Sequence, residues 1–247
     1  MIQAVIFDLD GTLVQTERLK AESYARAAVK LQPDHLHERD IVEFFKTVVG
    51  LSRNEVAKAI LTRFKLTGAA AQHMADYGVS TPWQAFIQLR LREYEAMLAD
   101  DELLRRNQWP HNVQLLHMVR FAGCKTGLAT MSYCDQVERV LRILNLQDQF
   151  DFIATRDDVE HGKPDPEIYQ LVAHELGIKP AHCLVIEDSP TGVKAAQAAG
   201  MQVVAVTTPF TREAFAAGTV LGRHWVVDDP TLLPGVIERV MKQTTIL

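Results

Sequence analysis

Two carboxylates follow an apolar segment near the amino terminus, and this feature constrains the fold most strongly. Residues 4–7 are all apolar, and Asp8, Asp10 and Gly11 come soon after them. The segment predicts a buried strand that delivers both carboxylates to its carboxyl end. An isolated carboxylate in such a position costs several kcal/mol of desolvation unless a cation or hydrogen bonds compensate for it. We therefore expect the fold to bring a lysine or a metal ion to this point.

Length and composition are those of an ordinary globular protein. The 247 residues, 47 % apolar and 23 % charged, suffice for one large α/β domain or for a core with a smaller insert. The net charge of −5 offers no basic surface, so we expect neither nucleic acid nor membrane as a partner. No apolar segment is long enough to span a bilayer, and the first residues lack the features of a signal peptide, which predicts a cytoplasmic location. Three cysteines without a CxxC pair predict reduced thiols that fill the core: Cys124, Cys134 and Cys183.

Short β-rich segments alternate with helical ones through most of the chain. The predicted strands are residues 3–8, 125–130, 152–155, 183–187 and 202–206. The predicted helices among them are residues 112–121, 136–144, 166–176 and 191–199, where apolar residues recur at helical spacing. This alternation predicts an α/β fold with a parallel sheet and helices on both faces.

One long region interrupts the alternation. Between residues 16 and 100 the sequence predicts amphipathic helices only, at residues 21–31, 39–48, 55–64 and 83–98. We interpret residues 16–100 as an inserted cap domain, and residues 1–15 with 101–247 as the core, because the polar motifs begin before the insert and resume after it. The alternative is that these helices form an ordinary layer on the sheet. Thr16 and the segment near Asp100 are candidate hinges for opening and closing the cap, with plain loops as the alternative.

Polar residues stand at the ends of four predicted strands. In open parallel sheets, ligands bind beyond the carboxyl ends of the strands, so these residues are expected to meet at one edge. They are Asp8, Asp10, Thr130, Ser132, Lys163, Glu187 and Asp188.

The residue types suit phosphoryl transfer with a metal ion. A carboxylate such as Asp8 can attack phosphorus, while Asp10 can protonate a leaving oxygen and later deprotonate an attacking one. Mg²⁺ takes oxygen ligands, which Asp8 and Asp188 can supply. Lys163 would neutralise phosphate charge, and the hydroxyl of Thr130 suits a phosphate oxygen.

Each of these residues also has an ordinary structural interpretation. Asp10 can belong to a turn, Thr130 and Ser132 can be turn residues, and Lys163 can be a solvated loop lysine. The pair at 187–188 can precede a helix whose first turn contains a proline. Only the Asp8 and Asp10 motif outweighs its alternative individually, but the order and placement of all four groups make coincidence improbable.

The motifs resemble those of the haloacid dehalogenase-like hydrolases. Residues 8–12 (DLDGT), Thr130, Lys163 and residues 187–188 (ED) match the four motifs of that family. Residues 162–166 (GKPDP) and 186–192 (IEDSPTG) are most similar to the branch of β-phosphoglucomutase and phosphoglycolate phosphatase, which carries a helical cap. The resemblance covers nearly the whole chain and implies a Rossmann-like parallel-sheet core with an inserted all-helical cap domain.

The resemblance also implies a chemistry. It implies Mg²⁺ and an aspartyl-phosphate intermediate, with Asp8 as nucleophile and Asp10 as acid and base. It implies metal binding by Asp8, by Asp188 and by the backbone carbonyl of Asp10, with Glu187 acting directly or through water. We expect Gly11 and Ser132 to bind the substrate.

The cap is expected to select the substrate. Residues 50–53 (GLSR) resemble the cap loop whose arginine holds the distal phosphate in β-phosphoglucomutase, so Arg53 indicates a substrate with a second anionic group. An exposed arginine that follows a serine cap is an equally good interpretation. Lys20, Arg90 and Arg92 are further candidate cations of the cap, and Lys20 and Arg90 are candidates for substrate binding. We favour a solvated helix face for Arg90 and Arg92.

Two departures favour a phosphatase over a mutase. Lys20 stands where the sugar mutases carry a histidine that steadies the acid and base, and Tyr133 and Cys134 replace a Lys-Asn pair that contacts phosphate. We expect a Mg²⁺-dependent, monomeric phosphatase of a small phosphorylated metabolite such as a sugar phosphate. A sugar phosphomutase is the runner-up. A metal- and phosphate-binding regulatory module and a dehalogenase are weaker alternatives.

Overall fold

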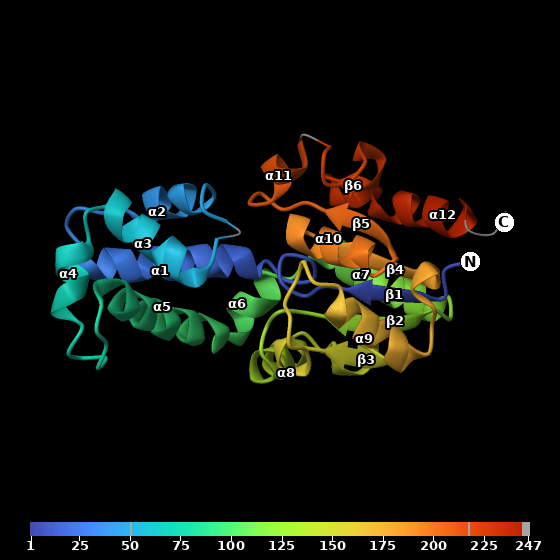
Figure 1. Cartoon of the computed structure of the whole chain (residues 1–247), viewed down its shortest axis with the longest axis horizontal. Helices are drawn as coiled ribbons and strands as arrows, with labels where there is room; N and C mark the ends of the chain where they lie inside the picture. The colour runs from blue at the N-terminus through green and yellow to red at the C-terminus, as the bar shows by residue number, and fades with distance from the viewer. Residues whose placement is uncertain (50, 217, 244–247) are drawn as a thin grey trace. The chain divides into compact units, whose positions relative to one another are not determined.

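The computed structural model describes residues 1–49, 51–216 and 218–243 and divides the chain into two compact units. One unit comprises Met1–Gln15 and Leu104–Leu247, and the other comprises Thr16–Leu103. The chain therefore enters the second unit at the start of helix α1 (Thr16–Leu31) and leaves it within helix α6 (Asp101–Arg106) (Figure 1).

The first unit is built on a parallel sheet. Within the described residues the sheet has six strands in the order β3-β2-β1-β4-β5-β6. The strands are β1 (Ala4–Phe7), β2 (Lys125–Ala129), β3 (Phe152–Ala154), β4 (Cys183–Glu187), β5 (Gln202–Val206) and β6 (Val226–Val227). This topology confirms the predicted α/β fold with a Rossmann-like sheet.

Strands β1 and β4 are apolar up to Glu187, the last residue of β4, because both faces of the sheet are covered. All residues of β1 and β4 are buried. On one face, alternate residues such as Ile6 and Val185 pack in one cluster with Val172 of α9 (Glu167–Leu176) and Val193 of α10 (Pro190–Ala198). Helix α7 (Pro110–Phe121) contacts β2 and α12 (Leu233–Gln243).

The predicted elements of this unit differ from the observed ones mainly at their ends and at the edge of the sheet. Helix α8 (Cys134–Ile143) begins two residues earlier than predicted. Cys183 is buried as predicted, but Cys124 is only partly buried, and Cys134 is exposed, so the prediction that Cys134 fills the core is wrong. Strand β6, α12 and the short helix α11 (Arg212–Ala216) were not predicted. A two-residue edge strand contributes too few residues for alternation to be recognised.

The second unit is helical in its described residues 16–49 and 51–103, which agrees with the predicted content of this region. It contains α1, α2 (Glu38–Phe45), α3 (Arg53–Arg63), α4 (Thr67–Gln72) and α5 (Pro82–Leu98). Helix α1 packs against α2 and α5, and the ring of Tyr24 lies 5.6 Å from that of Phe45 and 5.9 Å from that of Phe86, between ring centroids. Helix α1 starts at Thr16, five residues before the predicted position 21.

Among the residues that the structure describes, none of the helices combines the length and apolar character needed to cross a bilayer.

The close packing of β2 against α9 yields a prediction. A Cβ atom at Gly127 would lie 2.4 Å from Cγ1 of Val172, a branched side chain that the helix holds in place. We expect Gly127→Ala to lower the free energy of unfolding by about 1–3 kcal/mol, as overpacking does, in urea titrations. Gly235→Ala in α12 is the matched control: a Cβ there meets nothing within 4 Å, so no loss of stability is expected. Wild-type stability of Gly127→Ala would contradict the packing.

Candidate active site

Neighbouring strands bring three carboxylates together. The backbone N–H of Asp8 donates to the carbonyl of Ile186 at 3.0 Å, which places the end of β1 beside the end of β4. In the described part of the chain, Asp8, Glu187 and Asp188 form a group whose ligand oxygens lie within 4.8 Å of one another. The three residues are 5 %, 1 % and 1 % exposed. The expected meeting of acids at the carboxyl ends of the strands is therefore present.

Lys163 lies inside this group. Its ammonium donates to Oδ1 of Asp8 at 2.7 Å, to Oε1 of Glu187 at 2.8 Å and to the carbonyl of Ala129 at 3.0 Å. These three acceptors use the three protons of the ammonium. The side chain is only 5 % exposed, so the interpretation of Lys163 as a solvated loop lysine is wrong.

The loop before α9 holds Lys163 in this position. The carboxylate of Glu167 accepts the backbone N–H of Glu160 at 3.0 Å and of His161 at 2.8 Å. A Cβ atom at Gly162 would lie 2.9 Å from Cε of Met131, so the chain passes close to that side chain. These contacts fix the residues that precede Lys163, whose side chain then reaches the acidic group.

Glu187 is saturated with hydrogen bonds. Its Oε2 accepts the backbone N–H of Asp188 at 2.7 Å, and the backbone N–H and hydroxyl of Ser189 at 2.6 and 3.0 Å. Its Oε1 accepts the hydroxyl of Tyr169 at 3.3 Å in addition to the ammonium of Lys163. Ser189 also caps α10, because its hydroxyl accepts the backbone N–H of Gly192 at 3.1 Å.

Two glycines make room for the carboxylates. Gly11 has φ +87°, in the left-handed region, and a Cβ atom there would lie 2.2 Å from Oδ2 of Asp188. A Cβ atom at Gly192 would lie 1.6 Å from Oε1 of Glu187. Any side chain at either position would displace an acid of the group.

Asp10 belongs to a neighbouring hydroxyl cluster. Its Oδ2 accepts the hydroxyl of Thr130 at 3.2 Å and that of Ser132 at 2.5 Å. The backbone N–H of Ser132 donates to the hydroxyl oxygen of Thr130 at 3.1 Å. The two hydroxyls therefore orient one oxygen of Asp10, so neither residue is a simple turn residue.

Burial and the charge of the partner shift the pKa of Asp8 and of Lys163 in opposite directions. Desolvation raises the pKa of the Asp8 carboxyl to about 7. The ammonium of Lys163 lowers this pKa, whereas the negative charges of Glu187 and Asp10 raise it. Burial alone would lower the pKa of Lys163, but Asp8 and Glu187 raise it well above its usual value, so the ammonium stays charged. With all three carboxyl groups ionised, as a bound cation would favour, the four groups carry two excess negative charges. The donor set therefore fits a divalent cation with a preference for oxygen ligands.

The predicted cap cations all belong to the helical unit. Arg53 is exposed at the start of α3, Lys20 is partly buried on α1, and Gly50 of the predicted cap loop lies outside the described residues. Arg90 is 5 % exposed, so the solvated helix face that we favoured for it is wrong. Its guanidinium lies over the rings of Tyr24 and Tyr94, 4.9 and 4.5 Å from their centroids.

Arg92 is exposed, as the solvated-face interpretation predicts, with its guanidinium 4.5 Å from the ring centroid of Tyr77. A role of Lys20, Arg53 and Arg90 in substrate binding stays a prediction.

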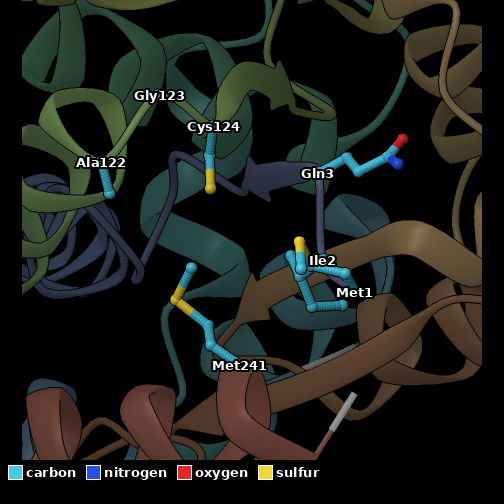
Figure 2. Close-up of a pocket in the computed structure, with 7 residues that line it drawn as sticks. All are labelled: Met1, Ile2, Gln3, Ala122, Gly123, Cys124 and Met241. Atoms are coloured by element: carbon cyan, nitrogen blue, oxygen red, sulfur yellow. The ribbon is translucent and has the colours of Figure 1, made fainter. Parts of the chain in front are cut away.

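A separate hollow of about 470 Å³ lies at the amino ends of two central strands, away from the acidic group (Figure 2). It borders residues that precede β1 and β2, and Figure 2 shows the sulfur atoms of Met1, Cys124 and Met241 around it. None of its lining side chains is charged, so it has no carboxylate that could bind a metal ion or attack phosphorus. The acidic group at the carboxyl ends of the strands remains the candidate site.

The buried ammonium yields a second prediction. We expect Lys163→Met to lower the free energy of unfolding by about 3–5 kcal/mol in EDTA, because it leaves Asp8 and Glu187 buried without their cation. Lys125→Met is the matched control: Lys125 is exposed and lies 3.5 Å from Asp151, and such bridges contribute at most about 1 kcal/mol. Equal losses for the two variants, measured by urea unfolding, would contradict the assigned role.

The whole chain resembles known phosphate-processing proteins. The profile of the haloacid dehalogenase-like hydrolases matches residues 2–200. A phosphorylated carbohydrates phosphatase of Thermotoga maritima is 32 % identical over 81 % of this chain and 83 % of the relative. The β-phosphoglucomutase of Bacillus subtilis is 30 % identical over 83 % of both chains. A crystal structure of β-phosphoglucomutase from Clostridium difficile has a TM-score of 0.65 at 25 % identity, and covers 98 % of this chain and 100 % of that one. The chain belongs to the haloacid dehalogenase-like hydrolase family, which confirms the resemblance of its motifs.

Proposed function

We propose that the protein is a Mg²⁺-dependent phosphatase of small phosphorylated metabolites, with sugar phosphates as the first candidates. The observation that carries the proposal is the buried group of Asp8, Lys163, Glu187 and Asp188, with Asp10 beside it. A cluster built only for stability would not bury three carboxylates around one ammonium, since apolar residues of similar size stabilise a core at least as well.

The relatives support the substrate class. The Thermotoga protein is named for phosphorylated carbohydrates, and a Streptomyces relative with 29 % identity is named a validoxylamine A 7'-phosphate phosphatase. Both names describe phosphatases of phosphorylated molecules. We extend this class of substrate to the present chain.

The chemistry follows from the two aspartates. An Oδ atom of Asp8 attacks the phosphorus of the monoester, the bond from phosphorus to the ester oxygen breaks, and an acyl phosphate forms on Asp8. The carboxyl of Asp10 gives its proton to the leaving oxygen, then takes a proton from the water that attacks phosphorus in the second step. The products are an alcohol, inorganic phosphate and the original Asp8 carboxylate. Thr130 and Ser132 hold Asp10 in place for both transfers.

The cation contributes electrostatically. Mg²⁺ would be held by Asp8, Asp188 and the backbone carbonyl of Asp10, with Glu187 bound directly or through water, and would stabilise negative charge on the phosphoryl oxygens. Lys163 adds its fixed positive charge and keeps Asp8 oriented. Water exclusion falls to the helical unit, which we propose acts as a cap hinged near Thr16 and Asp100.

A phosphomutase is the second candidate, favoured by the 30 % identity to the Bacillus β-phosphoglucomutase. We prefer the phosphatase because Lys20, Tyr133 and Cys134 replace side chains that a sugar mutase uses to hold phosphate and the acid-base residue. ³¹P NMR with Mg²⁺, β-glucose 1-phosphate and a trace of glucose 1,6-bisphosphate separates the two. Growth of inorganic phosphate supports the phosphatase, whereas glucose 6-phosphate with little free phosphate supports the mutase.

The nucleophile can be tested by substitution. We expect Asp8→Asn to lower phosphate release from a sugar-phosphate panel by more than about 10⁴-fold, because an amide does not attack phosphorus. Mass spectrometry must show that the asparagine has not deamidated. Asp148→Asn, an exposed aspartate of the same unit, should keep full activity. Substantial turnover by intact Asp8→Asn would refute the mechanism.

The metal site can be tested without substrate. We expect Mg²⁺ to bind the EDTA-treated and dialysed protein in calorimetric titrations. Asp188→Asn should weaken that binding by more than about 10-fold, the loss that changes in the outer shell of a metal site already reach. Unchanged affinity in Asp188→Asn would remove this residue from the ligand set. Activity should disappear in EDTA and return with added Mg²⁺.

A further inference from the structure

Tyr169 lies beneath the acidic group in a position that no motif of the sequence marks. Helix α9 places it in the core with no exposed surface. Its hydroxyl donates to Oε1 of Glu187 at 3.3 Å, and its ring centroid lies 4.9 Å from the ammonium of Lys163. The one side chain thus contacts both partners of a buried ion pair, through a hydrogen bond and through the face of its ring.

The hydrogen bonds of Glu187 limit what this carboxylate can do. Oε2 accepts three donors from Asp188 and Ser189, and Oε1 accepts Lys163 and Tyr169. Two carboxylate oxygens offer about four lone-pair positions, so these donors leave no good direction for a metal ion. Direct binding of a metal to Glu187 would require the loss of at least one of these bonds.

We propose that Tyr169 is a positioning residue of the metal site: its hydroxyl keeps Oε1 of Glu187 on Lys163, so that Glu187 orders the site through hydrogen bonds and not as a direct metal ligand. This inference rests on the Mg²⁺ site of the proposed function. Lys163, held by Glu187, in turn fixes Asp8. Glu187 also accepts the backbone N–H of Asp188 and so fixes that residue. Partners in the outer shell of metal sites orient the ligands in this way.

The variant Tyr169→Phe tests this inference, because the direction of the change in Mg²⁺ affinity distinguishes the two roles of Glu187. The variant keeps the ring beneath Lys163 and removes only the hydroxyl. If Glu187 acts from outside the metal shell, the loosened site should bind Mg²⁺ about 10-fold more weakly in calorimetric titrations of the substrate-free protein. We expect kcat to fall by a similar factor, about 10-fold, with KM for substrate unchanged.

The control must lose a buried hydroxyl elsewhere in the same unit. Thr126 on β2 is fully buried, and its hydroxyl donates to the carbonyl of Gln149 at 2.7 Å. Thr126→Val should therefore lower stability without changing Mg²⁺ affinity. A purely structural role of the Tyr169 hydroxyl predicts that both variants behave alike.

Unchanged or tighter Mg²⁺ binding in Tyr169→Phe would overturn the inference, since a freed Glu187 oxygen that binds the metal directly would increase affinity. If the wild-type protein releases phosphate and binds Mg²⁺ but Tyr169→Phe binds Mg²⁺ with unchanged affinity, only this inference is refuted. A wild type that binds Mg²⁺ but turns over no phosphate ester defeats the proposed function, while the comparison of affinities still decides the role of Tyr169. A wild type that binds no Mg²⁺ overturns both.

Discussion

The candidate site depends on the three hydrogen bonds of one buried ammonium. Lys163 joins Asp8 at the end of β1, Glu187 at the end of β4 and the carbonyl of Ala129 at the end of β2. Three adjacent strands of the sheet therefore meet at one side chain. Without that charge, the burial of two acids beneath the protein surface would cost several kcal/mol. Gathering these charges costs stability, and a bound ligand would offset that cost. The site therefore supports a function that depends on binding a charged ligand.

Backbone geometry makes this concentration of charge possible. The parallel register of β1 and β4 sets Asp8 beside Glu187 and Asp188. Gly11 and Gly192 leave space for carboxylates that any side chain would exclude. Hydrogen bonds from the loop after β4 then fix Glu187, and hydroxyls after β2 fix Asp10. The acids differ in their partners: hydroxyls hold Asp10, the ammonium of Lys163 holds Asp8, and Glu187 accepts both that ammonium and backbone amides.

Much of this arrangement could be predicted from the sequence, because it follows from strand ends. Apolar segments predicted five strands of the sheet, and a parallel sheet gathers whatever follows them at one edge. What could not be predicted depends on tertiary contacts. Tyr169 lies among apolar residues of a predicted helix, and the sequence does not reveal which partner its hydroxyl meets when the ring is buried. The burial of Arg90 was missed, since helical spacing alone does not reveal that Tyr24 and Tyr94 flank its guanidinium.

We propose that Asp8 is a nucleophile that Lys163 orients beside a divalent cation. Beryllium trifluoride mimics a phosphoryl group on a carboxylate, so ¹⁹F NMR of the protein with Mg²⁺ and this anion tests the claim most directly. We predict bound fluorine signals in the wild-type protein with Mg²⁺, and their loss in EDTA and in Asp8→Asn. Absence of bound signals from the folded wild-type protein, or identical signals in Asp8→Asn, would contradict the account.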